Sequence, residues 1–362
     1  MRAHVDIAVV GSGAAGIAAA VTVGRAGRST HLLDQRPAAG GTGGFSGLTT
    51  LCGLYDDEGH FLDDGFPREF AEALCESAPV RMGRVWVLPY RPLRFRAAAN
   101  EFLAATPGLR TLWNTPLADV LVEAGRIVSV NGISVGAVID CSGSAAIARA
   151  IGIDCLATDD QTQSPSIVFP LHNVTRDVST PAAVAQILLP LARAGLPPLS
   201  FQPNLETNTV TIKFSGRPDQ VRSAIQFLQA NVSGFETCVT PLTEFPVARR
   251  EGRMIMGQYL LTGADVLAAR KFPDAVARCG WPIEQWGPDG FARFRYLPQG
   301  TYYEIPGRSL RAAKVQNLFM AGKTISADAD AIGSARVMGC CLATGAAAGR
   351  LAIAHLENAL TK

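Results

Sequence analysis

The chain has 362 residues, of which 48% are hydrophobic and 18% are charged, and its formal net charge is +2 at pH 7. The near-neutral charge and the scattered basic residues argue against a nucleic-acid or anionic-membrane surface, and no apolar run approaches the roughly 20 residues of a membrane span. No signal-peptide core precedes the first predicted strand, so we expect a cytoplasmic protein, long enough for two domains.

The first predicted element is a buried strand over residues 5–10 that runs directly into the pattern Gly-x-Gly-x-x-Gly. A small-residue helix, a second strand and an acid follow, as in dinucleotide-binding motifs. Gly11 permits the tight turn, Gly13 lets the backbone approach a pyrophosphate, and Gly16 lets the helix pack on the strand. The helix N-terminus offers N–H groups to the phosphates. Asp34 can accept ribose hydroxyls, which argues against NADP at this site.

Helices and short strands follow a glycine-rich segment at 37–60. We predict helices at 66–78 and 91–106, and strands at 117–123, 126–130 and 137–140. From about residue 156 to residue 304 the prolines multiply, and strand-like stretches alternate with helix-like ones. After this region, residues 317–322 are predicted to form a buried strand that leads to a long helix from about 334 to 356.

This order predicts an α/β fold with a Rossmann-like dinucleotide-binding domain that is split in the sequence. Its first part covers 1–155, with a helical excursion near 61–106, and its last part covers 305–362. An α+β substrate or cap domain is inserted at 156–304. NAD-dependent dehydrogenases usually keep their strands contiguous, so the split arrangement favours a permanently bound dinucleotide such as FAD.

Several separated motifs carry a resemblance that extends over nearly the whole chain. They are Gly11-x-Gly-x-x-Gly, Gly40-Gly-Thr, Gly65-Phe-Pro-Arg-Glu-Phe, Val138-Ile-Asp-Cys-Ser-Gly, Arg249-Arg-Glu-Gly-Arg, Phe272-Pro-Asp-Ala-Val-Ala-Arg-Cys-Gly, Tyr303-Glu-Ile-Pro-Gly-Arg-Ser-Leu, and Ala321-Gly-Lys-Thr-Ile-Ser with Gly333-Ser-Ala-Arg-Val-Met. Together they resemble the bacterial FAD-dependent oxidoreductase family of the two-dinucleotide-binding-domain flavoproteins. The resemblance implies FAD as the cofactor.

The resemblance also implies roles for individual segments. The loop at 40–43 would follow the pyrophosphate and ribityl chain, because it offers N–H groups without side-chain bulk. The backbone near Leu117 would hold the adenine. Gly333 and Ser334 would open the last helix, whose N-terminus would face the flavin and stabilise the reduced ring by roughly 0.3–2 kcal/mol; plain helix packing is the alternative. Lys323 stands where many flavoproteins have aspartate, and a cation there could hold a phosphate oxygen or the flavin edge.

The cofactor contacts expected from these motifs come from both parts of the split domain. They are Gly11, Ser12, Gly13, Ala15, Gly16, Asp34, Gln35, Gly40, Gly41, Thr42, Gly43, Leu117, Ser142, Gly143, Gly322, Lys323, Gly333, Ser334, Arg336 and Val337.

Two kinds of flavin chemistry lack their motifs. The disulfide reductases of this superfamily carry two cysteines where this chain has Gly43 and Leu48. The aromatic monooxygenases carry Gly-Asp and a proline-rich loop, which are missing after Gly322. We therefore predict hydride transfer between a small organic substrate and flavin N5, with an electron acceptor that no motif identifies. The alternatives are a flavin monooxygenase and a non-redox binding or assembly module that contains FAD.

Four residues are candidates for catalysis or substrate contact. Arg249 and Arg253 belong to the densest charge cluster, and arginine suits an anionic small-molecule substrate; a solvated surface is the alternative. Tyr303 is a candidate proton acceptor, although core packing is equally compatible. Cys52 lies on the loop expected near the flavin and could react with it, but a single unpaired thiol is more often inert.

The eight cysteines form no CxxC pair. In a reducing compartment we expect most of them, including Cys340 and Cys341 in an Ala/Gly-rich helical stretch, to be small buried apolar groups. No spacing of His, Cys and acidic residues suggests a metal site.

Overall fold

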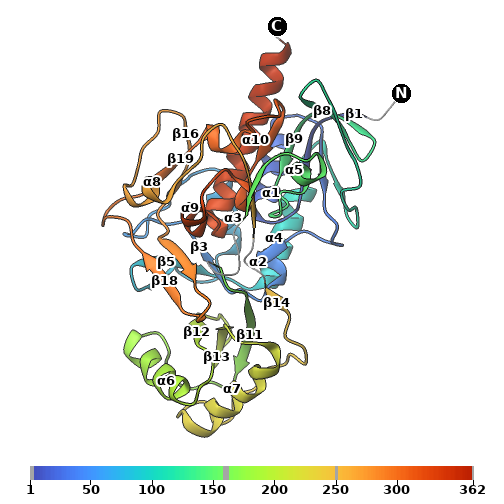
Figure 1. Ribbon diagram of the computed structural model, residues 1–362. Coiled ribbons are helices and arrows are strands. Elements are labelled where there is room, and N and C mark those ends of the chain that lie inside the picture. The colour runs from blue at the N-terminus through green and yellow to red at the C-terminus, as the bar shows by residue number, and fades with distance from the viewer. Residues whose placement is uncertain (1–3, 158–162, 249–251, 361–362) are drawn as a thin grey trace.

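A seven-stranded sheet organises the larger of the two bodies in Figure 1, a computed structural model that describes residues 4–157, 163–248 and 252–360. The strand order is β6-β2-β1-β9-β8-β7, and β20 pairs with the end of β9. The strands β6, β2, β1, β9 and β20 run parallel, while β7 and β8 form an antiparallel meander. The bounds are β1 (His4–Val10), β2 (Thr30–Leu33), β6 (Leu109–Leu112), β7 (Val120–Glu123), β8 (Arg126–Val130), β9 (Ile133–Asp140) and β20 (Leu318–Met320).

The pairing of β20 with β9 confirms the predicted α/β fold. These strands are separated in sequence by the whole inserted region, yet Met320 lies opposite Asp140 in a parallel register. The paired residues 138–140 and 318–320 are all buried, as expected for parallel strands covered on both faces.

Two helices pack against each other through glycines and alanines beside this sheet. They are α1 (Ala14–Arg25) and α10 (Met338–Leu360). A Cβ placed on Gly345 of α10 would lie 2.1 Å from the carbonyl oxygen of Ala15, so the two backbones approach closely. The window 338–359 has a mean hydropathy of 1.2, and its length and composition would also suit a membrane span, unlike the sequence-based expectation. However, 67% of an 18-residue window within this segment is buried inside the fold, as in a core helix.

The excursion between β2 and β6 contains helices and a small sheet. The helices α3 (Phe66–Leu74) and α4 (Pro92–Ala104) confirm the two predicted helices, with slightly earlier ends. A three-stranded antiparallel sheet and the short helix α2 complete the excursion: β3 (Thr50–Cys52), β4 (Val80–Met82), β5 (Val85–Pro89) and α2 (Gly41–Phe45). Aromatic rings from α3 and α4 pack edge to face, with Phe70 and Phe95 at 4.9 Å between centroids.

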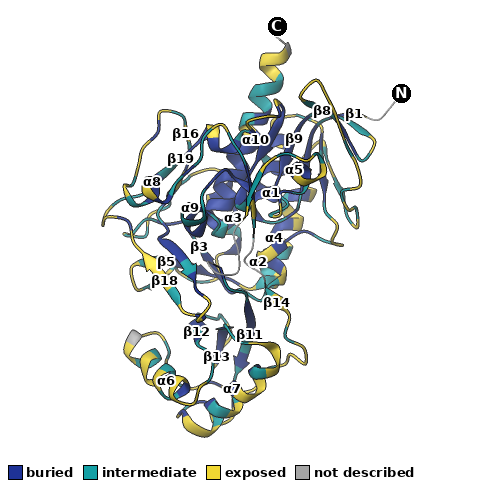
Figure 2. Cartoon of the chain, viewed as in Figure 1, coloured by how far each residue is buried: buried dark blue, intermediate teal, exposed yellow. Residues whose placement is uncertain are grey.

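The smaller body is a four-stranded antiparallel sheet covered by two helices, with its own hydrophobic core. Its strand order is β12-β13-β11-β14. The elements are β11 (Ser166–His172), α6 (Pro181–Arg193), β12 (Leu199–Gln202), β13 (Thr209–Phe214), α7 (Pro218–Asn231) and β14 (Val247–Ala248). Figure 2 shows that α6 and α7 expose their outer faces to solvent and bury the faces that meet the sheet.

The second half of the inserted region belongs to the core of the larger body. Buried residues such as Trp281 and Ile283 share the hydrophobic cluster that also contains α1 and α10. The elements of this half are β15 (Arg253–Ile255), α8 (Gly263–Leu267), β16 (Ala275–Cys279), β17 (Ile283–Trp286), β18 (Ala292–Arg295) and β19 (Tyr303–Pro306). Two short elements precede the smaller body in the chain, α5 (Ala146–Ala150) and β10 (Cys155–Ala157), and β10 pairs with β15. The region predicted as one domain at 156–304 thus contains two differently packed parts, because local composition does not show which core a segment joins.

Candidate functional site

The turn after β1 has the geometry that its glycines predict. Gly11 has φ +97°, and a Cβ on it would lie 2.6 Å from the carbonyl oxygen of Cys141. A Cβ on Gly16 would lie 1.7 Å from the carbonyl oxygen of Gly11. Any larger residue at either position would displace a backbone segment, so both glycines are required by contacts within the fold.

Gly13 and Gly41 face each other at the N-terminus of α1. Gly41 has φ +48°, and a Cβ on it would lie 2.7 Å from the Cα of Gly13. A Cβ on Gly13, by contrast, would have its nearest neighbour at 4.0 Å. No side chain caps α1, so its first-turn N–H groups can bind a phosphate. We call this place, formed by residues 11–16 and 40–41, the cofactor cradle.

Asp34 is tied to the cradle by hydrogen bonds. The backbone N–H and the hydroxyl of Ser12 both donate to Asp34 Oδ2 at 2.7 Å, and the Arg36 N–H donates to Oδ1 at 2.9 Å. A carboxylate has about four lone-pair positions, so Asp34 keeps one acceptor site for a ribose hydroxyl. Gln35, which follows, is exposed.

The other predicted cofactor residues in the first part of the split domain differ in how far they are buried. Thr42 is exposed beside the cradle. Gly43 is buried: a Cβ on it would lie 2.4 Å from the Phe95 ring, and its carbonyl accepts the Tyr90 hydroxyl at 2.9 Å. Packing against α4 therefore requires glycine at position 43. Leu117 is half-buried in the loop after β6.

The carboxyl ends of β9 and β20 bring four predicted residues side by side. The Ser142 hydroxyl donates to Asp140 Oδ1 at 2.6 Å, and a Cβ on Gly143 would lie 3.0 Å from Lys323 Cε. The Gly322 N–H donates to Thr344 Oγ1 of α10 at 3.1 Å. A Cβ on Gly322 would lie 3.0 Å from the Cβ of Ala15, which links this edge to the cradle. Ligands of open α/β sheets bind at this edge.

The prediction that Gly333 and Ser334 open the last helix is wrong. They lie inside a separate helix, α9 (Ala329–Ala335), which Asp328 caps by accepting the Ala331 N–H at 2.8 Å. The helical conformation is interrupted at Arg336 and Val337, and α10 starts at Met338. The Asp328 cap explains the earlier start, and Gly333 lies where α9 closely approaches the Glu284 backbone. The N-terminus of the last helix is therefore at Met338 and not at residues 333–334.

Tyr303 is a core residue and has no solvent access. Its side chain is fully buried in β19, and its hydroxyl lies 2.8 Å from Ser334 Oγ, which also bonds the Trp281 carbonyl oxygen at 2.5 Å. Burial raises the pKa of the Tyr303 hydroxyl. The proposed role of Tyr303 as a proton acceptor is therefore wrong, because its hydroxyl is enclosed and already partnered.

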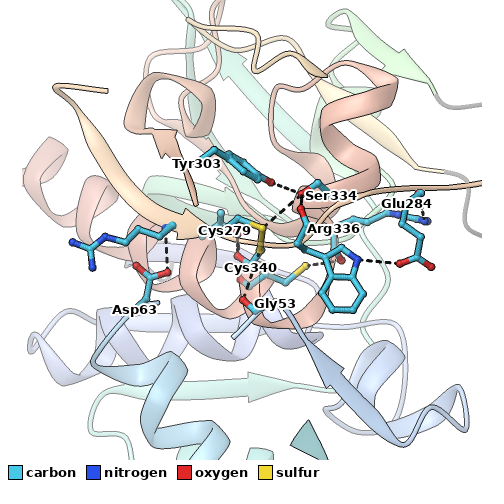
Figure 3. The surroundings of a disulfide bond; sticks show 12 residues. Gly53, Asp63, Cys279, Glu284, Tyr303, Ser334, Arg336 and Cys340 are labelled. Carbon is cyan, nitrogen blue, oxygen red and sulfur yellow. Dashed lines mark hydrogen bonds between the residues drawn. A yellow bond between two sulfur atoms is a disulfide. The ribbon is translucent and has the colours of Figure 1, made fainter. Parts of the chain in front are cut away.

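A disulfide joins Cys279 of β16 to Cys340 of α10, with 6.0 Å between the Cα atoms. Figure 3 shows it between Tyr303, Ser334 and the Gly53 loop. The expectation that Cys340 is a simple packing thiol is wrong, because the cysteine that reaches it lies on a strand distant in sequence. We call this place, formed by β16, β17, β19, α9 and the start of α10, the junction region.

The junction region also holds a buried charged group that the motifs did not indicate. Glu284 of β17 accepts the indole N–H groups of Trp281 at 3.0 Å and Trp286 at 2.5 Å. Lys213, from β13 of the smaller body, reaches Glu284 Oε1 at 3.7 Å and lies 4.3 Å from the Trp286 ring centroid. Arg336 Nη2 donates to the Glu284 carbonyl oxygen at 3.4 Å. The two bodies thus meet at an ion pair.

Glu284 is held in its ionised form. Burial by itself would raise its pKa, but Lys213, Arg336 and the two indole N–H groups hold the pKa below its ordinary value. One sequence signal could have found it, since an acid between two tryptophans in an apolar strand must find donors when buried. Its cationic partner, Lys213, lies in the smaller body, and nothing in the sequence around Lys213 indicates this pairing.

Cys52 lies at the end of β3 near this group. Burial raises the pKa of its thiol to about 12, a further rise comes from Glu284, and Lys213 opposes it. The thiol is therefore protonated at neutral pH, and this environment does not activate it as a nucleophile.

Of the two candidate arginines, the structure describes only Arg253. Arg249 lies outside the described residues. Arg253 is exposed at the start of β15, opposite Ala157 of β10, and the neighbouring Gly252 lies close to Gly143 and Lys323. Among the residues that the structure describes, no group of three or more His, Cys, Asp or Glu side chains is placed to hold a metal ion.

The cradle fits the dinucleotide that the fold implies, since open space lies in front of Gly13 and uncapped N–H groups surround it. A family model described as FAD dependent oxidoreductase matches residues 6–206 and 200–361. No curated protein matches the chain significantly.

Three solved structures share the fold at low sequence identity. A geranylgeranyl bacteriochlorophyll reductase-like protein from Thermoplasma acidophilum is 12% identical over 99% of this chain and 80% of that chain, with a TM-score of 0.52. GidA from Aquifex aeolicus is 11% identical over 98% of this chain and 64% of that one, with a TM-score of 0.56. A flavoprotein/dehydrogenase from Cytophaga hutchinsonii is 14% identical over 98% and 79%, with a TM-score of 0.52. The match of the family model over nearly the whole chain shows that this protein belongs to the FAD dependent oxidoreductase family and uses FAD.

Proposed function

We propose that this protein transfers a hydride between a small organic substrate and FAD, and that the substrate binds where the smaller body meets the junction region. The observation that carries this proposal is the ion pair between Lys213 and Glu284, which brings charged side chains from both bodies next to the loop of Cys52. FAD, when bound, supplies the hydride acceptor or donor at N5.

The residues of this chain would orient the reactants and set the charge around them. The cradle would hold the pyrophosphate through backbone N–H groups. Lys323 and Arg336 both lie near Cys341: burial raises the pKa of that thiol to about 12, and these two cations oppose the rise. Positive charge at this edge would stabilise negative charge that develops on the reduced cofactor or on an anionic substrate. Glu284, kept ionised, would hold Lys213 in place.

The first experiment is anaerobic reduction of the FAD-loaded protein by a panel of hydroxy acids, amino acids, amines and alcohols. Bleaching of the flavin absorbance by one donor, without oxygen, supports hydride transfer and names the substrate class. Rapid NAD(P)H consumption with an oxygenated product would instead indicate a monooxygenase. Tight FAD binding with no reduction by any donor would indicate a non-redox module.

The arginine hypothesis is tested once a donor is known. Replacement of Arg249 and Arg253 by alanine should raise KM for an anionic substrate by about tenfold or more, because a bidentate contact to the carboxylate is lost. Unchanged turnover and KM would remove both residues from the substrate site.

A further inference from the structure

A pocket lies apart from the cradle, between β16, the 3-10 helix η1 (Gly307–Leu310) and α10. Its volume is about 560 Å³. Val276 and Leu351 contribute apolar walls, and Gln258, Arg308 and Arg311 contribute polar ones. None of the residues that line it belongs to the cradle or to the Lys213–Glu284 pair.

The two arginines of this pocket differ in their partners. Arg308 is neutralised by Asp274, with Nε and Nη2 donating to the two carboxylate oxygens at 3.0 and 3.2 Å. Arg311 is half-buried, and its guanidinium lies 5.2 Å from the centroid of the Phe319 ring. Within the described parts of the chain, no carboxylate lies within 4.0 Å of Arg311. A partly desolvated cation without a counter-ion is stabilised by an anion from outside.

A second polar group beside the pocket also lacks a partner. His355 lies four residues after Leu351 on α10, hence on the same face of the helix. Its ring centroid is 5.8 Å from that of Phe319, and its Nε2 is buried with no hydrogen-bond partner in the part of the chain that the structure describes. Burial, together with Arg126 and Arg311, lowers the pKa of His355, so the imidazole is neutral. Arg311 and His355 therefore both contact Phe319, and among the described residues neither the Arg311 guanidinium nor His355 Nε2 has a polar partner.

We propose that this pocket binds a small organic carboxylate with an apolar body, and that Arg311 is its main contact. A guanidinium matches a carboxylate by two parallel N–H···O bonds. The apolar walls at Val276 and Leu351 suit a hydrocarbon or aromatic body better than a fully hydrated inorganic anion. This site goes beyond the proposed hydride transfer and does not depend on it.

The test is titration of sodium benzoate into the FAD-loaded protein by calorimetry, with the flavin absorbance recorded in parallel. We expect saturable binding that leaves the flavin spectrum unchanged. Benzamide, which has the same ring without the charge, should bind at least about tenfold more weakly. Arg311→Gln should weaken benzoate binding by at least about tenfold. Ala275→Phe, which fills the pocket and keeps Arg311, should weaken it by a similar factor through a different route.

The matched control is Arg193→Gln, an exposed arginine on α6 of the smaller body, which should bind benzoate as the unaltered protein does. The proposal is overturned if benzoate shows no saturable binding, or if both pocket variants bind it undiminished. Binding that changes the flavin spectrum would place benzoate at the cofactor instead. Inorganic phosphate binding as tightly as benzoate would overturn the apolar part of the proposal.

Discussion

The cofactor cradle and the junction region both lie in the larger body, but different groups form them. The cradle consists of backbone groups, and its geometry depends on glycines that permit approaches too close for any Cβ. The junction region consists of side-chain partners: a disulfide, a shared hydroxyl and a carboxylate between two indoles. The comparison shows that a close backbone approach requires glycine, which a motif can reveal in the sequence. The disulfide and the contact between Tyr303 and Ser334 join residues far apart in the chain and leave no comparable mark.

The disulfide should make the largest contribution to stability in the junction region. Because Cys279 and Cys340 are separated by 61 residues, loop-closure entropy predicts that Cys340→Ser lowers the free energy of unfolding by about 4 kcal/mol. Urea unfolding of the oxidised protein measures this loss. Cys75→Ser, at an exposed free cysteine, is the control and should change little. Equal stability of Cys340→Ser and the unaltered protein would show that the bond does not form.

Two glycines separate the structural from the binding role of the cradle. Gly16→Ala should lower the free energy of unfolding by about 3 kcal/mol or more, since its Cβ would meet the Gly11 carbonyl oxygen. Gly13→Ala should cost less than about 1 kcal/mol, because its Cβ meets open space, yet it should weaken FAD binding. Urea unfolding of the apoprotein and titration with FAD measure the two effects. Similar losses of stability in both variants would contradict this division.

Asp63, drawn with the surroundings of the disulfide in Figure 3, makes the free energy of unfolding depend on pH. Burial raises its pKa to about 6, although the Arg278 N–H and the charges of Arg278 and Arg350 oppose the rise. Since the folded-state pKa is above the ordinary value of 3.8, its contribution to stability is full below pH 3.8 and is lost as the pH rises through about 6.

Asp63→Asn should therefore stabilise the protein at neutral pH by about 2–3 kcal/mol and remove this part of the pH dependence. Unfolding by urea at a series of pH values measures the difference. Asp64→Asn, at the adjacent exposed acid, is the matched control. A variant that is less stable than the unaltered protein at every pH would show that the Asp63 carboxylate is needed as an acceptor.

The smallest expected effect concerns Tyr303. Tyr303→Phe removes one buried hydrogen bond to Ser334 and should cost about 1 kcal/mol. The pH profile of substrate oxidation should stay unchanged, because the hydroxyl is enclosed in the core. A shift of that profile would return Tyr303 to the catalytic candidates and weaken the view that this region is purely structural.

The parts of the site that the sequence predicted are those fixed by local rules. The strand, the glycine turn, the helix and Asp34 come together within one short segment, and the structure places them as predicted. The split of the sheet was also predictable, since 317–322 has the apolar pattern of a buried strand. Gly43 was predicted as a cofactor contact, whereas the structure shows that glycine is needed there for packing against Phe95, which lies on another helix.

The α/β fold, the FAD cradle and the principal strands and helices of the dinucleotide-binding domain follow from the sequence, because hydrophobic periodicity and glycine signals act over a few residues. Three features appear only in the folded protein: Cys340 meets Cys279, Tyr303 is enclosed, and Lys213 of the smaller body pairs with Glu284 of the larger one. The physical reason is that these contacts depend on how separate segments pack. A side chain's neighbours across the core are set by the whole fold and leave no spacing in the sequence.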